Sequence, residues 1–170
     1  MNLSSPSRAR GGTLEMSEKL ADLYRDILME HYRFPRGHKH LEHPDIANEG
    51  QNPICGDEID IQLKLEGERV KDISVNCVGC AISVASGSML AEIIEGKTLA
   101  EVKRIATVVK AMVKGEPIDE SVDLGDLEAL KGVKQFPVRV KCALLSWTTL
   151  VDAIEAREHG TIPQFSSTEQ

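Results

Sequence analysis

Residues 59–78 read IDIQLKLEGERVKDISVNCV, and this stretch decides the fold. Apolar side chains alternate strictly with polar ones from Ile59 to Leu65, which is the pattern of a half-buried strand. Residues Glu66–Arg69 have the composition of a turn, and Val70–Val78 predicts the returning strand of a hairpin. An antiparallel hairpin is therefore expected at the centre of the fold.

Helical patterns flank this hairpin on both sides. Before it, apolar residues recur at helical spacing from Ser17 to Tyr32. The helices expected after it are Ala81–Ile94, Thr98–Val113 and Cys142–Ala156, with a short one at Leu127–Lys131. The stretch Phe34–Pro53 is rich in Pro, Gly and His and predicts a long surface loop. The expected fold class is α+β, a small antiparallel sheet packed against several helices.

The length and composition of the chain fit one folded domain. Its 170 residues are 41% apolar, which is enough for a single core. Both ends have little to bury, since Met1–Gly12 is rich in Ser, Arg and Gly and the residues after Gly160 are similar. We therefore expect one domain at residues 16–160, with flexible tails at residues 1–15 and 161–170.

Charge and hydropathy exclude several classes of partner. A net charge of −7 disfavours nucleic acid, because phosphate binding requires a basic face. No apolar run is long enough to span a bilayer and no signal-peptide core follows Met1, so we expect a cytoplasmic protein without a membrane partner. Thiols stay reduced in that compartment, and the four cysteines therefore indicate a metal or catalytic site rather than disulfides.

Three of the cysteines fall at the ends of expected elements. Cys55 precedes the first strand of the hairpin, Cys80 follows the second strand at the mouth of a helix, and Cys142 is expected to open the last helix. A helix N-terminus lowers the pKa of a thiol and favours the thiolate. Gly56 allows Cys55 and Asp57 to point at one place. Three thiolates and one carboxylate make a plausible tetrahedral zinc site, which is harder to explain as three unrelated buried cysteines.

The fourth cysteine offers a different ligand set. Cys77 and Cys80 form a Cys-x-x-Cys pair, so a site of four cysteines without Asp57 is chemically reasonable. Strand alternation instead places Cys77 on the face of Ile73 and Val75, which is the expected core face. We favour Asp57 as the fourth ligand and a buried, uninvolved Cys77, while the alternative stays open.

Two further groups of residues allow either a functional or an ordinary interpretation. Three histidines in the polar loop could bind a second metal, but solvated loop histidines are the preferred interpretation. A basic group near Cys142 could be ordinary surface or a docking face for an acidic partner, and neither is favoured. The histidines are His38, His40 and His43. The basic group consists of Lys131, Lys134, Arg139 and Lys141.

Several motifs resemble those of the U-type iron–sulfur cluster assembly family, the SufU, IscU and NifU N-terminal-like proteins. They are Asn52-Pro53-x-Cys55-Gly56-Asp57, Gly79-Cys80-Ala81-Ile82-Ser83-x-Ala85-Ser86-x-Ser88-Met89, Lys141-Cys142, and Leu23-Tyr24-x-x-Ile27-Leu28-x-x-His31-Tyr32-x-x-Pro35. The resemblance implies a compact α+β domain that takes persulfide sulfur from a cysteine desulfurase and works with downstream iron–sulfur assembly proteins. It also implies that Cys55, Asp57, Cys80 and Cys142 are the metal-site residues.

Two departures from the general scaffold pattern indicate the SufU branch of this family. Lys141 stands where the scaffold form has His, and Phe136-Pro137-Val138-Arg139 replaces a Pro-rich chaperone-recognition motif. The long stretch between Cys80 and Cys142 also leaves room for the branch's insertion. The resemblance then implies bound zinc, Cys55 as the sulfur acceptor once a histidine of a SufS-like desulfurase replaces it on zinc, and a partner contact at Arg139.

Three functions remain open at this point. The first is a zinc-bound sulfur acceptor that activates a desulfurase. The second is a scaffold for a [2Fe–2S] cluster, because three cysteines and an aspartate could also hold iron. The third is a structural zinc module that only docks a partner. Lys141 weighs against the second function, and the loop position of Cys55 weighs against the third because structural sites are usually closed.

Overall fold

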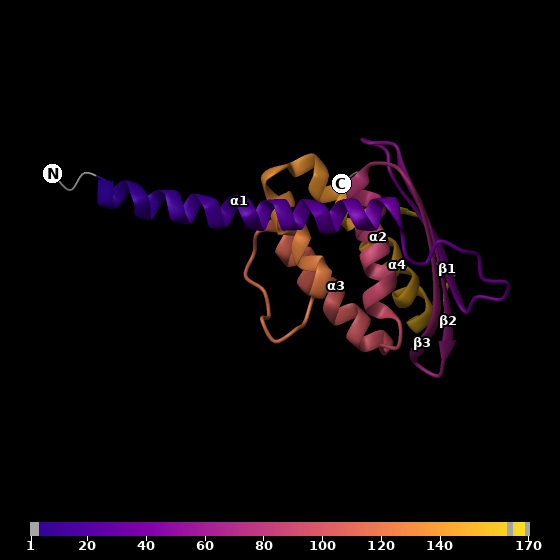
Figure 1. The fold of residues 1–170 in the computed structure, drawn as a ribbon. Helices are drawn as coiled ribbons and strands as arrows, with labels where there is room; N and C mark the ends of the chain where they lie inside the picture. Colours follow the sequence, from indigo (N-terminus) through magenta and orange to yellow (C-terminus); the bar gives the residue numbers. More distant parts are fainter. Residues whose placement is uncertain (1–3, 163–164, 169–170) are drawn as a thin grey trace.

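The protein is a small sheet with its helices gathered on one face (Figure 1). The computed structural model describes residues 4–162 and 165–168, with side chains from residue 18 onward. Its elements are α1 (Ser4–Arg33), β1 (Ile46–Asn52), β2 (Asp57–Glu66), β3 (Arg69–Val78), α2 (Ala81–Ile94), α3 (Leu99–Lys114), the 3-10 helix η1 (Gly125–Gln135), α4 (Pro137–Glu158) and β4 (Ser166–Ser167). None of the described helices is both long and apolar enough to cross a membrane.

The sheet has the strand order β3-β2-β1-β4. Strands β2 and β3 form the predicted antiparallel hairpin, in which Ile61 pairs with Val75 and Leu63 with Ile73. Strand β1 is antiparallel to β2, whereas β4 is parallel to β1. The α+β class is confirmed, but the sheet is mixed and not purely antiparallel.

Strand β1 lies inside the stretch that was predicted to be a loop. Its buried face consists of Ile46, Asn48, Gly50 and Asn52, so three of its four inward positions are not apolar. Asn48 donates a hydrogen bond to the carbonyl of Thr149 at 3.0 Å, and a Cβ on Gly50 would lie 2.1 Å from the Thr149 hydroxyl oxygen. This strand is buried through polar contacts and close backbone approach, which a hydrophobicity pattern does not detect.

The helices also differ from the sequence expectation at their ends. Helix α1 begins at Ser4 and not at Ser17, so it runs through most of the predicted N-terminal tail. Glycines at positions 11 and 12 made a helix there look unfavourable. In the predicted C-terminal tail, Ser166 is buried and donates a hydrogen bond to Asp152 at 2.6 Å. That the two ends are flexible remains a prediction.

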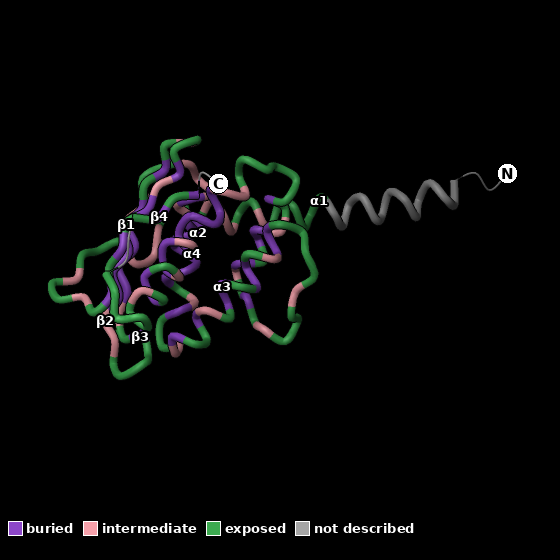
Figure 2. The backbone as a smooth tube through the Cα atoms, turned by 180° about the vertical axis from the view of Figure 1, so that it is seen from behind, coloured by how far each residue is buried: buried purple, intermediate pink, exposed green. Residues whose placement is uncertain are grey.

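The core lies between the sheet and helices α2 and α4. The inward strand residues Ile59, Ile61 and Leu63 are at most 4% exposed. Helix α2 is buried along most of its length, and Figure 2 shows the same for the central part of α4. Helix α3 adds an apolar face that begins after its N-cap Thr98, whose hydroxyl accepts a hydrogen bond from the Glu101 N–H at 3.1 Å. The rigid sheet and helices hold the loop that carries Cys55.

Candidate metal centre

Three of the four predicted ligands meet at one end of the sheet. The ligand atoms of Cys55, Asp57 and Cys142 all lie within 4.8 Å of one another. The two sulfur atoms, Cys55 Sγ and Cys142 Sγ, are 3.5 Å apart. Asp57 and Cys142 are fully buried, whereas Cys55 is half-buried. The cluster is therefore anchored by two enclosed side chains and open to solvent at Cys55.

The position of Cys55 is set by the turn between β1 and β2. The Asn52 carbonyl accepts hydrogen bonds from the N–H groups of Cys55 at 3.3 Å and of Gly56 at 2.9 Å. Gly56 has a φ of 73°, a left-handed conformation that glycine adopts at little cost. This turn allows Asp57 to begin β2 with a buried side chain, whose carboxylate lies within 4.8 Å of the Cys55 thiol.

Cys80 joins the cluster from the hairpin's other end through Asp57. It is the N-cap residue of α2, as predicted, and its N–H donates a hydrogen bond to Asp57 Oδ1 at 2.8 Å. Its thiol lies 4.0 Å from Asp57 Oδ2, outside the tighter group of three. A Cβ on the preceding residue, Gly79, would lie 2.1 Å from Asp57 Oδ1, so only glycine leaves room for this carboxylate.

Two polar residues that support the cluster were not identified from the sequence. The buried Ser83 hydroxyl donates a hydrogen bond to Asp57 Oδ2 at 2.6 Å. The Asn52 amide nitrogen lies 3.5 Å from Cys142 Sγ and donates to it. Ser83 follows Cys80 by three residues, one helical turn, and this spacing could have placed it at the site. Asn52 opens the motif that carries Cys55 and Asp57, but no sequence pattern connects it with Cys142, because its strand lies in a stretch that predicts a loop.

The thiols of Cys80 and Cys142 differ in their tendency to ionise. Burial raises the pKa of the Cys80 thiol, but hydrogen bonds from the Ser83 backbone, the Ser83 hydroxyl and Cys142 outweigh burial and lower it overall. Burial raises the pKa of the Cys142 thiol, and its contacts with Asp57, Cys55 and Cys80 raise it further.

The expectation that Cys142 opens a helix is wrong. Helix α4 begins at Pro137, so Cys142 lies in its second turn, away from the free N–H groups.

Arg139 is the cation beside these thiols. It is exposed, and its pKa is raised by a hydrogen bond with Cys142 and by the negative charges of Cys80 and Cys142. Its guanidinium therefore stabilises thiolate forms at the cluster from the solvent side. Whether it also contacts a partner remains a prediction.

Cys77 lies apart from the cluster's three closest ligands. It pairs with Ile59 across the hairpin and packs against the hydrophobic core. Burial, followed by the charges of Asp57 and Cys80, raises the pKa of its thiol to about 12. Its position outside the group of Cys55, Asp57 and Cys142 separates it from the ligands, whereas its pKa does not, because burial raises the pKa of the Cys142 thiol as well.

The residues of this cluster fit a zinc ion. Two thiolates bound at about 2.3 Å to one tetrahedral zinc lie about 3.8 Å apart, close to the 3.5 Å between Cys55 Sγ and Cys142 Sγ. The carboxylate of Asp57 is 0% exposed, and a buried carboxylate surrounded by thiols is stabilised by a cation. Sulfur and carboxylate donors in this number are typical of zinc, and they can also hold iron.

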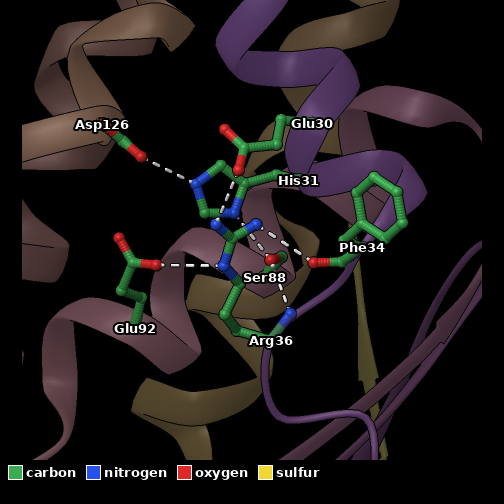
Figure 3. Close-up of polar contacts among 7 residues, drawn as sticks. All are labelled: Glu30, His31, Phe34, Arg36, Ser88, Glu92 and Asp126. Atoms are coloured by element: carbon green, nitrogen blue, oxygen red, sulfur yellow. Dashed lines mark hydrogen bonds and ion pairs between the residues drawn. The ribbon is translucent and has the colours of Figure 1, made fainter.

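A second group of potential ligands, His31, Glu92 and Asp126, serves a different purpose (Figure 3). The ring of His31 is fully buried, with Nδ1 2.7 Å from Ser88 Oγ and Nε2 2.9 Å from Asp126 Oδ2. Glu92 forms an ion pair with Arg36 at 3.1 Å. Because both ring nitrogens and the Glu92 carboxylate are engaged, we interpret the group as a clamp that joins α1, α2 and η1. The loop histidines His38, His40 and His43 are exposed, as expected for solvated side chains.

Comparisons with known proteins give a consistent result. Residues 23–156 match the family described as NifU-like N terminal domain. The chain is similar to the zinc-dependent sulfurtransferase SufU of Bacillus subtilis, with 40% identity over 86% of this chain and 99% of that protein. It is 36% identical to the iron–sulfur cluster assembly scaffold protein IscU of Streptococcus pyogenes, over 81% of this chain and 86% of that one.

The fold has a similar counterpart among solved structures. A putative iron–sulfur cluster assembly scaffold protein for the SUF system from Fervidobacterium islandicum superposes with a TM-score of 0.72. The two sequences are 35% identical, and the match covers 75% of this chain and 93% of the other. The arrangement of sheet and helices described above is therefore shared with that protein.

Proposed function

This chain belongs to the NifU-like N-terminal domain family of iron–sulfur cluster assembly proteins, and from that premise we propose that it is a zinc-bound sulfur acceptor. Its sulfur donor is a cysteine desulfurase that carries a persulfide, and its recipients are downstream iron–sulfur assembly proteins. The 40% identity to a protein named zinc-dependent sulfurtransferase supports the zinc-bound form over the scaffold form.

The observation that carries this proposal is the difference in exposure within the cluster. Cys142 is 0% exposed and lies inside a helix, whereas Cys55 is half-buried and lies on a turn. A donor persulfide can reach Cys55 without disturbing the core. Cys80 is also half-buried, but its N–H is tied to Asp57 at 2.8 Å and its backbone begins α2.

The chemical step requires one bond to form and one to break. The Cys55 thiolate attacks the outer sulfur of the donor persulfide, and a new sulfur–sulfur bond forms on Cys55. The donor's own sulfur–sulfur bond breaks, and its electron pair leaves with the donor cysteine as a thiolate. Arg139 stabilises the negative charge near the cluster during this exchange, because its guanidinium already faces Cys142 and Cys80.

We assign zinc binding to Cys55, Asp57, Cys80 and Cys142. When bound, zinc supplies positive charge that keeps thiolates deprotonated at neutral pH. Asp57 is held in place for this role by the Cys80 N–H at 2.8 Å and the Ser83 hydroxyl at 2.6 Å. Outer hydrogen bonds of this kind fix the orientation of a metal ligand.

A scaffold for a [2Fe–2S] cluster is the second candidate function. The same three cysteines and aspartate could hold iron, and the Streptococcus relative is named a scaffold protein. Lys141, which stands before Cys142, makes the zinc form preferable because it adds no further metal ligand next to the cluster.

The proposal is tested by following sulfur onto each cysteine. The zinc-loaded protein is incubated with a cysteine desulfurase and cysteine, and persulfides are mapped by mass spectrometry while sulfide release is measured. We expect the first persulfide on Cys55 and no stimulation of sulfide release by Cys55→Ser. The matched control, Cys77→Ser, should behave as wild type. A first persulfide on Cys77 or Cys142, or normal turnover with Cys55→Ser, would falsify the acceptor assignment.

A further inference from the structure

A groove of about 560 Å³ runs between α1 and η1, beside the metal centre. Most of its lining comes from α1 and η1, and it includes Leu20, Tyr24, Leu28, Lys131, Lys134 and Phe136. Its near end reaches Ile82 and Arg139, which flank Cys80 and Cys142 in the sequence. The rest extends along α1, away from the thiols.

The groove offers an apolar surface in the form of a stripe. Leu20, Tyr24 and Leu28 are spaced by four residues on α1 and therefore share one face of the helix. At a rise of 1.5 Å per residue, this stripe is about 12 Å long, the length of two helical turns. Leu20 is 48% exposed and Phe136 59%, which are high values for large apolar side chains in a folded domain.

The rim of the groove is basic, in contrast to the chain as a whole. Its lining includes Arg25, Lys131, Lys134 and Arg139 and contains no acidic residue, although the chain has a net charge of −7. Arg25 pairs with Asp22 at 2.8 Å and Lys131 with Glu128 at 3.4 Å, both just outside the lining. These exposed pairs contribute little to stability and can exchange for a partner's carboxylates.

The two walls of the groove are held at a fixed separation. Helix α1 forms one wall and η1 the other, and His31 of α1 lies 2.9 Å from Asp126 of η1. The other ring nitrogen of His31 is anchored 2.7 Å from Ser88 of α2, as Figure 3 shows. A fully buried imidazole bonded on both sides leaves little freedom for the walls to move. The groove therefore exists before any partner arrives, which reduces the cost of binding.

We propose that this groove binds an acidic amphipathic helix of a protein partner. The apolar stripe of α1 contacts the apolar face of that helix, and the basic rim forms ion pairs with the carboxylates of the helix. Exposed apolar side chains continue beyond the groove at Leu23, 54% exposed, and Val138, 50% exposed, so the surface suits a partner longer than a small molecule. This proposal assigns a binding surface in addition to the sulfur-transfer site. It does not depend on whether Cys55 is the sulfur acceptor.

The test uses a synthetic helix as the probe. A fluorescein-labelled peptide of about 15 residues, built from glutamate and leucine at helical spacing, is titrated with the full-length zinc-loaded protein and followed by anisotropy. Reversing the rim with Lys131→Glu and Lys134→Glu together should weaken binding at least about tenfold. The matched control, Lys71→Glu with Lys110→Glu, changes the net charge equally on exposed positions outside the groove and should have less than about a twofold effect.

Further binding measurements distinguish an amphipathic helix from other ligands of the groove. A peptide of the same charge in which serine replaces leucine should bind at least about tenfold more weakly, because it cannot fill the apolar stripe. The milder Lys134→Gln variant replaces the double variant if circular dichroism shows that the latter is unfolded. Equal binding of both peptides, equal weakening by the control variant, or no binding to wild type overturns the proposal. Preferential binding to phosphatidylglycerol vesicles over the peptide also overturns it.

Discussion

Cys55 Sγ lies 3.5 Å from Cys142 Sγ, although the two cysteines are 87 positions apart in the sequence. The contact exists because α4 packs behind β1 and brings its second turn to the β1–β2 turn. Two thiols at this separation suit one metal ion, and the buried Asp57 carboxylate supplies a third donor within 4.8 Å.

The first prediction concerns metal content. Protein purified without added metal should contain about one zinc per chain, because three thiols and a carboxylate form one tetrahedral set. Cys80→Ser and Cys142→Ser should each reduce the zinc content sharply, as measured by inductively coupled plasma mass spectrometry. Full zinc retention in both variants, or iron as the main metal in wild type, would contradict the assignment.

The second prediction separates Asp57 from Cys77 as the fourth ligand. Asp57→Ala should weaken zinc affinity, since its carboxylate belongs to the tight group of donors, whereas Cys77→Ser should leave affinity nearly unchanged. Competition with a colorimetric chelator measures both. The reverse order of affinities would establish the site of four cysteines and rule out Asp57 as the fourth ligand.

How much of this site can be predicted from the sequence depends on the kind of signal. The hairpin and α2 follow from local periodicity, and the ends of a hairpin must meet, so the proximity of Cys80 and Asp57 was predictable. Strand β1 was not, because its inward face contains Asn48, Gly50 and Asn52 in place of apolar residues.

Contacts that depend on tertiary packing could not be predicted from the sequence. The bond between His31 and Asp126 joins residues 95 positions apart, and no motif links them. The predicted position of Cys142 within its helix was also wrong: the helix was expected to begin at Cys142, whereas it begins at Pro137, where proline is well tolerated. The consequence is chemical, since burial raises the pKa of Cys142 where a helix N-terminus would have lowered it.

The third prediction follows from the contrast between Cys77 and Cys80. A pKa of about 12 for Cys77 leaves on the order of one thiolate in 10,000 molecules at pH 8, whereas the lowered pKa of Cys80 favours its thiolate. In metal-free protein, iodoacetamide should therefore modify Cys80 well before Cys77, with Cys77 labelling rising only as pH approaches its pKa. Peptide mapping over time gives the two rates, and comparable rates at pH 8 would show that Cys77 is ionised.

The fourth prediction concerns the clamp at His31. Asp126→Ala removes the partner of a buried ring nitrogen and should lower the free energy of unfolding by about 1–3 kcal/mol. Glu120→Ala, an exposed acidic residue in the segment that leads into η1, is the matched control and should change it by less than about 0.5 kcal/mol. Urea denaturation at neutral pH measures both, and equal effects would mean that the clamp adds no stability.

The last prediction tests whether Arg139 has a role outside zinc binding. Its side chain is exposed, and a hydrogen bond with Cys142, followed by the charge of Cys80, raises the pKa of its guanidinium. An arginine is charged at every physiological pH. A charge at the mouth of the site is well placed to bond a docking desulfurase. Arg139→Ala should therefore raise the Kd for the desulfurase about tenfold or more by isothermal titration calorimetry, since a charge-assisted contact is lost. Its zinc content should remain that of wild type, because the four donor side chains are unchanged. Arg104→Ala, an exposed arginine on α3, is the control and should alter neither quantity. Normal desulfurase binding by Arg139→Ala would contradict the partner contact, and loss of zinc together with affinity would mean that Arg139 acts through the metal centre.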